Sequence, residues 1–127
     1  MRLEYLRDGS SDCPLIRLYD FDARAVIVLR DLVVELAEGS RRELAVHDLP
    51  DVDALGGCQL VLEVGTRNRG VIPERSPTSF RCVLTDASWE NVAGLMGPFC
   101  EPGASGGFQW LSDEGKVSLL LSGDGHW

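Results

Sequence analysis

The sequence lacks the residue patterns that common enzyme chemistries require. It contains neither the lysine-bearing glycine loop of phosphate-binding proteins nor the glycine fingerprint of dinucleotide-binding folds, so nothing in it indicates nucleotide binding. Histidine, the most frequent general base, occurs only at His47 and His126. The cysteines are scattered, without the close pairs of a zinc site or a disulfide framework; they are Cys13, Cys58, Cys82 and Cys100. We therefore expect no catalytic residue, no cofactor and no metal.

Positive charge is also scarce. Twelve lysines and arginines stand against 20 aspartates and glutamates, which gives a net charge of −8. Nucleic-acid binding depends on neutralising phosphates with lysine and arginine, and anionic membranes repel acidic proteins, so we expect neither as a partner. An acidic surface instead keeps a protein dissolved or attracts a basic partner.

Long apolar runs are missing as well. No stretch approaches the ~20 apolar residues of a membrane-spanning helix. The first residues alternate charged and apolar side chains and do not form the apolar region of a signal peptide. Together with the scattered cysteines, this predicts a protein of the reducing cytoplasm.

One stretch imitates a hydrolase motif. Residues 103–107 match the G-x-S-x-G pattern, and Asp113 or Asp124 and then His126 follow in the order that a catalytic triad needs. That motif requires a strand before the serine and a helix after it, so that a strained turn exposes the hydroxyl. Here Pro102 precedes the motif and an aromatic strand follows it. We interpret the stretch as a glycine loop.

A second stretch imitates a metal site. Residues 51–56 begin like a calcium loop, but Leu55 and Leu62 stand where oxygen ligands belong. His47 and three aspartates close to it form the densest group of potential ligands for a hard metal. Nothing in their spacing makes them converge, so we expect a solvated, charged loop.

Two segments have helical spacing. The first has Asp20 or Asp22 as its N-cap and Gly39 at its end. Its apolar side chains recur on one face; they are Val26, Leu29, Val33 and Leu36. A second, shorter helix is predicted to begin at Asp86 or Ser88 and to end at Gly97-Pro98. The positions that it buries are predicted to be Trp89, Val92, Ala93 and Met96.

Alternating apolar side chains predict the strands. The segments are 2–7, 15–19, 42–47, 58–64, 80–85 and a C-terminal hairpin from Phe108 to Leu121. Cys58 and Cys82 fall in phase with the apolar positions, so we expect them to be buried. Adjacent strands joined by short polar turns indicate a single mainly antiparallel sheet with two helices packed on one face. We expect one compact α+β domain over residues 1–127.

Charge is distributed unevenly along the chain. Residues 65–85 carry a net charge of +3, whereas the segments before and after them are both acidic. A basic, partly apolar hairpin on an acidic body is a candidate contact for an acidic partner or for a second copy of the chain. Its residues are Arg67, Arg69, Val71, Ile72, Arg75 and Arg81. The alternative is a solvated hairpin that only offsets local repulsion.

The first helix has a second apolar flank. Ile27 and Val34 lie seven residues apart, beside Arg30 and away from the main apolar face. They either pack under a loop, as a broad apolar stripe often does, or form a homodimer contact.

Two functions remain open at this point. The first is a small acidic non-catalytic interaction module that binds another protein or itself. The alternative is a small-molecule-binding or enzymatic domain with a pocket between sheet and helices. Its polar groups would be Asp20, Asp22, His47, Asp48, Cys100 and His126.

Overall fold

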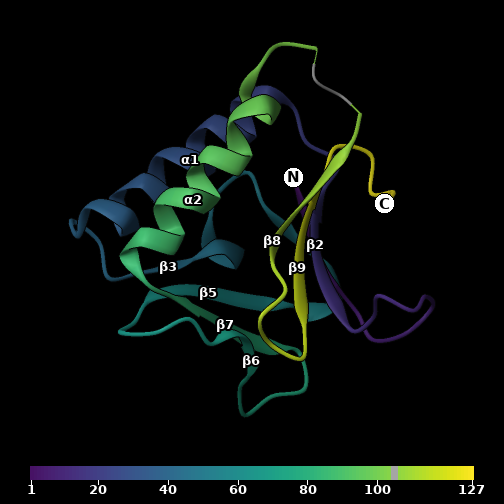
Figure 1. Cartoon of the computed structure of the whole chain (residues 1–127). Helices are drawn as coiled ribbons and strands as arrows, with labels where there is room; N and C mark the ends of the chain where they lie inside the picture. The colour runs from purple at the N-terminus through teal and green to yellow at the C-terminus, as the bar shows by residue number, and fades with distance from the viewer. Residues whose placement is uncertain (104–105) are drawn as a thin grey trace.

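The computed structural model describes residues 1–103 and 106–127, and over these ranges the chain forms two β-sheets and two α-helices (Figure 1). The elements follow in the order β1 (Arg2–Leu6), β2 (Leu15–Tyr19), α1 (Ala23–Glu38), β3 (Glu43–Ala45), η1 (Val46–Asp48), β4 (Asp53–Ala54), η2 (Leu55–Gly57), β5 (Gln59–Val64), β6 (Gly70–Pro73), β7 (Ser79–Leu84), α2 (Asp86–Met96), η3 (Gly97–Cys100), β8 (Phe108–Ser112) and β9 (Ser118–Ser122). The η elements are single turns of 3₁₀-helix. The predicted α+β class is confirmed.

The prediction of a single mainly antiparallel sheet is wrong. The strands form a five-stranded sheet in the order β4-β1-β2-β9-β8 and a four-stranded sheet in the order β3-β5-β7-β6. Both sheets are mixed, because β1 and β4, β2 and β9, and β5 and β7 pair in parallel. The antiparallel pairs β1–β2 and β8–β9 join strands that follow each other in the sequence, and the short turns between them indicate this pairing. Parallel partners come from distant parts of the chain, and local composition carries no sign of them.

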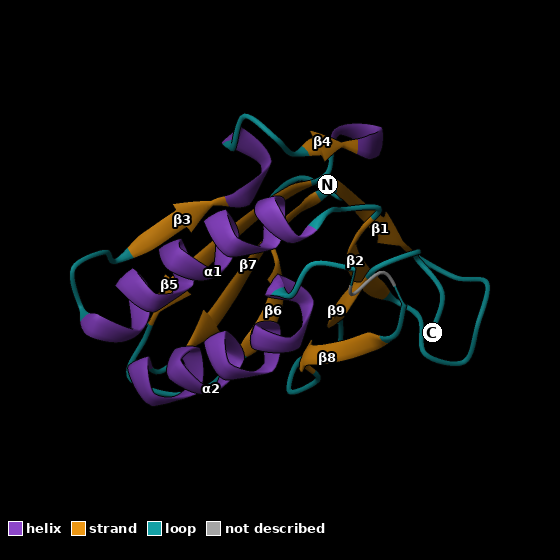
Figure 2. Ribbon diagram, turned by 90° about the horizontal axis from the view of Figure 1, so that it is seen from above, coloured by secondary structure: helices purple, strands orange, loops and turns teal. Residues whose placement is uncertain are grey.

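Both helices lie on the same side of the four-stranded sheet. Figure 1 shows α1 and α2 side by side above β3, β5 and β7, with β2, β9 and β8 rising next to them. Figure 2, seen from above, shows α1 in front of β5, with β7 visible between α1 and α2. Side chains from the helices and from both sheets form one hydrophobic cluster. Among the described residues, no helix is long and apolar enough to cross a membrane.

The first helix confirms its sequence signals. The Asp22 carboxylate accepts a hydrogen bond of 3.0 Å from the backbone N–H of Ala25 and so caps the first turn. Gly39 ends the helix with a left-handed φ of +84°, which only glycine adopts without strain. The buried face is the predicted one, made of Val26, Leu29, Val33 and Leu36.

The second helix begins at Asp86, as expected, although Thr85 caps it. The Thr85 hydroxyl accepts a hydrogen bond of 3.2 Å from the backbone N–H of Ser88. Trp89 is fully buried, and its indole N–H donates to the carbonyl oxygen of Glu63 at 3.0 Å. This bond attaches α2 to β5 and satisfies the polar end of the largest core side chain.

The two sheets meet where β6 approaches the turn between β8 and β9. Val71 and Val117 form a β-bridge across this junction. Gly70 has a φ of +71°, and a Cβ atom there would lie 2.5 Å from the backbone nitrogen of Gly115. The close approach of two backbones therefore requires glycine at position 70.

Candidate functional site

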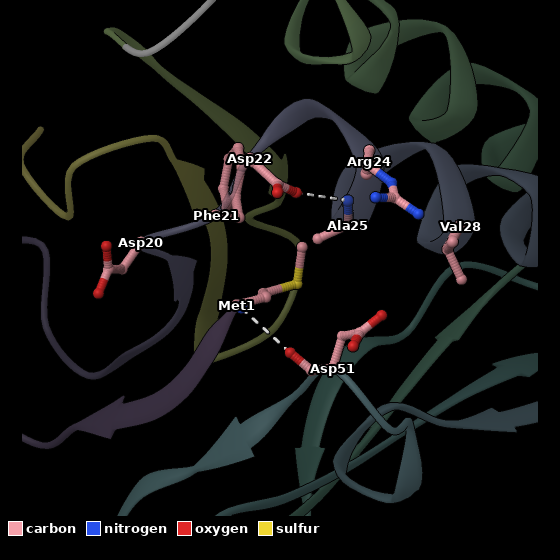
Figure 3. Close-up of a pocket in the computed structure, with 8 residues that line it drawn as sticks. All are labelled: Met1, Asp20, Phe21, Asp22, Arg24, Ala25, Val28 and Asp51. Carbon is pink, nitrogen blue, oxygen red and sulfur yellow. Dashed lines mark hydrogen bonds between the residues drawn. The ribbon is translucent and has the colours of Figure 1, made fainter.

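A pocket lies at the start of α1, beside Met1 (Figure 3). Its volume is about 440 Å³. Its walls are Met1, Asp20, Phe21, Asp22, Arg24, Ala25, Val28 and Asp51. Asp20 and Asp22, both named for the enzymatic alternative, thus line one cavity between a sheet and a helix.

The carboxylates of this pocket have separate structural partners. Asp20 forms an ion pair of 3.2 Å with Arg2, and Asp22 caps the helix. Figure 3 shows the Asp20 side chain pointing away from those of Asp22 and Asp51. The Asp20 backbone has a left-handed φ of +54°, which aspartate tolerates better than most residues. The pocket gathers acidic residues without directing their oxygens at one point.

The remaining groups named for the enzymatic alternative lie in different elements. The backbone N–H of Leu60 donates to Nδ1 of His47 at 3.1 Å, and Asp48 lies 3.7 Å from Nε2 of the same ring. Cys100 lies at the end of η3, where burial raises the pKa of its thiol. The His126 side chain is 89% exposed near the end of the chain. The structure does not bring these residues together.

Cys58 and Cys82 are buried, as their phase predicted. Their exposures are 1% and 0%. Burial raises the pKa of Cys58 to about 11 and that of Cys82 to about 12, so both thiols stay protonated and unreactive at neutral pH.

One of the two motif matches falls partly on residues that the structure does not describe. Ser105, the serine of the G-x-S-x-G match, lies outside the described residues. In residues 1–103 and 106–127, no three cysteine, histidine or acidic side chains gather as metal ligands. The strand predicted over 42–47 is shorter in the structure and ends at Ala45. His47 therefore lies in the 3₁₀ turn that follows β3.

Arg81 is held by three glutamates on the outer face of the four-stranded sheet. Its guanidinium lies 2.7 Å from Glu74, 2.9 Å from Glu63 and 3.1 Å from Glu43. The hydrogen bond to Glu74 is the main cause that raises the pKa of Arg81. The arginine therefore links β3, β5 and β7 within the molecule, and its charge is already matched there.

The other residues of the predicted basic hairpin divide into two groups. Val71 is buried at 1% exposure, so its assignment to a contact surface is wrong, because it packs in the core at the sheet junction. Ile72 is half-buried beside Arg81. Arg67, Arg69 and Arg75 are exposed in the loops at the two ends of β6. The structure thus separates Arg67 and Arg69 from Arg75, which lines a pocket of about 320 Å³ together with Arg81.

A groove runs between α1 and α2. Its volume is about 340 Å³, and its walls are Arg30, Val34, Ala37, Glu38, Glu90, Ala93 and Gly94. Arg30 and Val34, predicted from the second apolar flank of the first helix, both line it. Ile27 is 42% exposed on the same flank of α1. The structure therefore brings the three predicted helix residues to one surface.

The charge of the groove is mainly negative. The Arg30 guanidinium reaches across to α2, where its Nε donates to the carbonyl oxygen of Ala93 at 2.9 Å. Glu38 and Glu90 are exposed, and neither forms an ion pair with a described residue. Glu38 also lies at the negative end of α1, whose last turn has no basic residue.

Sequence reasoning missed the α2 wall of this groove. Glu90 and Gly94 had no predicted role, and Ala93 was predicted only as a buried position of the second helix. Gly94, a glycine inside a helical pattern, was the available signal. The exposed apolar side chain of Val28 also had no predicted role.

No known family model, curated protein or solved structure matches this chain.

Proposed function

We propose that this chain is a small, acidic, non-catalytic interaction module that holds a basic segment of a partner protein in the groove between α1 and α2. The observation that carries this proposal is Gly94. A glycine inside a helix costs about 1 kcal/mol relative to alanine. A Cβ atom at Gly94 would meet no atom within 4 Å, so no packing inside the chain requires glycine there. The glycine therefore lowers helix stability and leaves the groove open, which favours a surface that a partner fills.

Charge supports a basic occupant. The carboxylates of Glu38 and Glu90 border the groove on α1 and α2, and Arg30 already donates to Ala93. A lysine or arginine side chain entering the groove would meet two carboxylates that no described residue pairs, and the negative end of α1. The small apolar floor of Val34 and Ala93 would contact the aliphatic part of the same side chain.

The test adds one methyl group. Gly94→Ala should raise the melting temperature by about 3–5 °C, because it relieves the helix cost, while it reduces partner capture from a cell extract at least ten-fold. Gly97→Ala is the matched control, because it also adds a methyl where no atom lies within 4 Å but does not line the groove. Its capture should equal that of the unaltered protein.

Charge removal provides the second arm. Replacing Glu38 and Glu90 by glutamine should weaken capture and remove its dependence on salt. Capture that Gly94→Ala leaves unchanged, captured proteins that bind through acidic segments, or no specific capture at all would contradict the proposal.

A second candidate function is a small-ligand site in the pocket at the start of α1. Its 440 Å³ lies in the usual range for ligand pockets, and the left-handed Asp20 on its wall is a conformation found more often at binding sites. A fragment screen by ligand-observed NMR tests it. Binding that Ala25→Phe abolishes would support the site, and the absence of any such fragment would exclude it.

A further inference from the structure

We propose that two copies of this chain associate through the free edge of β8, which pairs antiparallel with β8 of the second copy and joins two five-stranded sheets into one. This inference goes beyond the proposed function and does not use the helix groove.

The outer edge of β8 carries main-chain groups that no other described strand pairs. β8 is the last strand of its sheet. The backbone N–H of Gly123 donates to the carbonyl oxygen of Gly107 at 3.2 Å, so these two residues form a hydrogen-bonded pair. Because bonded and non-bonded pairs alternate in an antiparallel ladder, Gln109 bonds β9 next. The main-chain groups of Phe108 and Trp110 therefore point away from β9.

The Gln109 side chain gives independent support for this direction. Its Nε2 donates to the carbonyl oxygen of Trp110 at 3.1 Å, so this oxygen bonds a group outside β9, as its outward direction requires. A side-chain amide is easily displaced, so a second strand would replace this bond with a main-chain bond.

β8 is also the least protected edge among the described strands. Natural sheets protect their edges with charge, proline, shortness or a covering segment. β4 has two residues, β3 has three and includes a glutamate, and β6 ends in Pro73 and is bridged by Val117. β8 contains no charged residue and no proline, and Phe108 on it is 46% exposed.

Charge favours this edge as the place where two like-charged molecules meet. Each copy has a net charge of −8, so long-range repulsion opposes association. Residues 102–112 form the longest run of the sequence without an acidic or basic side chain. Gly106 and Gly107, just before β8, are exposed and have no side chain that would collide with a second copy.

The register follows from the edge groups. With a two-fold axis at Gln109, Phe108 of each copy lies opposite Trp110 of the other. The outward N–H and C=O groups of these residues then form four hydrogen bonds across the axis. The two rings, 6.4 Å apart within one copy, gain cross-strand aromatic contacts on the same face. The register shift between Trp110 and Ser112 limits the flat edge to a few residues, so the interface is small and the dimer weak.

The test is sedimentation equilibrium from micromolar to millimolar protein. The average mass should rise from one chain to two with concentration. Association should strengthen with added NaCl, because salt screens the repulsion between the copies. Phe108→Pro removes an outward N–H and no bond to β9, so the fold should persist while the dissociation constant rises at least ten-fold.

Two further variants keep the test decisive. Phe108→Lys puts a charge at the edge and should also raise the dissociation constant of the dimer. This variant provides the test if Phe108→Pro does not fold. Ile27→Ala is the control, because it removes an exposed apolar side chain from α1 and not from β8. The average mass of this variant should rise with concentration as it does for the unaltered protein. Amide exchange gives a local readout: the amides of Phe108 and Trp110 should slow on association, whereas that of Gln109 should not change.

A monomer at every concentration, a dimer unaffected by both Phe108 variants, or a dimer abolished by Ile27→Ala would overturn the proposal. Capture of an extended segment of another protein at β8, without self-association, would overturn it as well. None of these outcomes depends on Gly94, so failure here and failure of the groove function are distinguishable.

Discussion

Ionisation of the two buried thiols should destabilise the fold in alkaline solution. In the folded chain, burial raises the pKa of Cys58 to about 11 and that of Cys82 to about 12, from 9.0 for an unperturbed thiol. At a pH between the unperturbed pKa of 9.0 and these raised pKa values, the unfolded chain releases thiol protons that the folded chain retains. The unfolded state then binds fewer protons, so the free energy of unfolding falls as the pH rises through this window.

The magnitude follows from the width of the window. At about pH 10, one unit above the unperturbed pKa, each thiol lowers the free energy of unfolding by about 1.4 kcal/mol. The two thiols together remove about 3 kcal/mol, a large part of the roughly 5–15 kcal/mol that holds a typical domain together. Near pH 7 both thiols are protonated in either state, and the contribution vanishes.

Urea unfolding under reducing conditions at about pH 7 and about pH 10 measures this effect. The matched control is the double variant Cys58→Ala, Cys82→Ala, which is less stable at both pH values but lacks the two buried ionisations. Between the two pH values, the original chain should lose about 3 kcal/mol more than the variant. An equal loss in both proteins would refute the reasoning, because other groups would then explain the alkaline instability.

Two further predictions concern the backbone. Asp22→Ala removes the cap of α1 and should lower the free energy of unfolding by about 1 kcal/mol, whereas Asp22→Asn should keep most of the stability that the cap provides. Thermal unfolding measures both variants, and equal losses would contradict the capping role. Gly70→Ala should lower it by more than about 2 kcal/mol, because a left-handed residue gains a Cβ against Gly115. Gly9 also has a positive φ, but a Cβ there would meet no atom within 4 Å, so Gly9→Ala should lower the free energy of unfolding less. Equal losses in urea unfolding would show that the contact at the sheet junction is unimportant.

The helices could be predicted because their determinants are local. The buried stripe of α1 follows from residues three and four apart, and its ends follow from Asp22 and Gly39. The same holds for Cys58 and Cys82, whose burial follows from alternation with their immediate neighbours.

The strand pairing could not be predicted in the same way. β2 pairs with β9, so Leu15 lies next to Ser118, and the whole middle of the chain separates them. The prediction of one antiparallel sheet treated neighbours in sequence as neighbours in space. This held for β1–β2 and β8–β9 and was wrong for the parallel pairs.

The candidate surfaces show the same division. Ile27, Arg30 and Val34 were found as a flank of one helix, but the groove exists only because α2 supplies the opposite wall. Arg81 was placed on a basic surface, although glutamates from β3 and β5 neutralise it. Charge summed along the chain does not report charge summed over a surface.

The sequence by itself determined where the two helices begin and end to within a residue or two, which of their side chains face inward, and that the molecule carries a strong negative charge. These properties depend on residues within a turn or two of one another, or on composition. Only the tertiary structure decided which strands are neighbours, which arginines have partners, and which edge and groove stay open. Those properties arise when distant segments pack together, and the packing energy depends on the whole set of contacts at once.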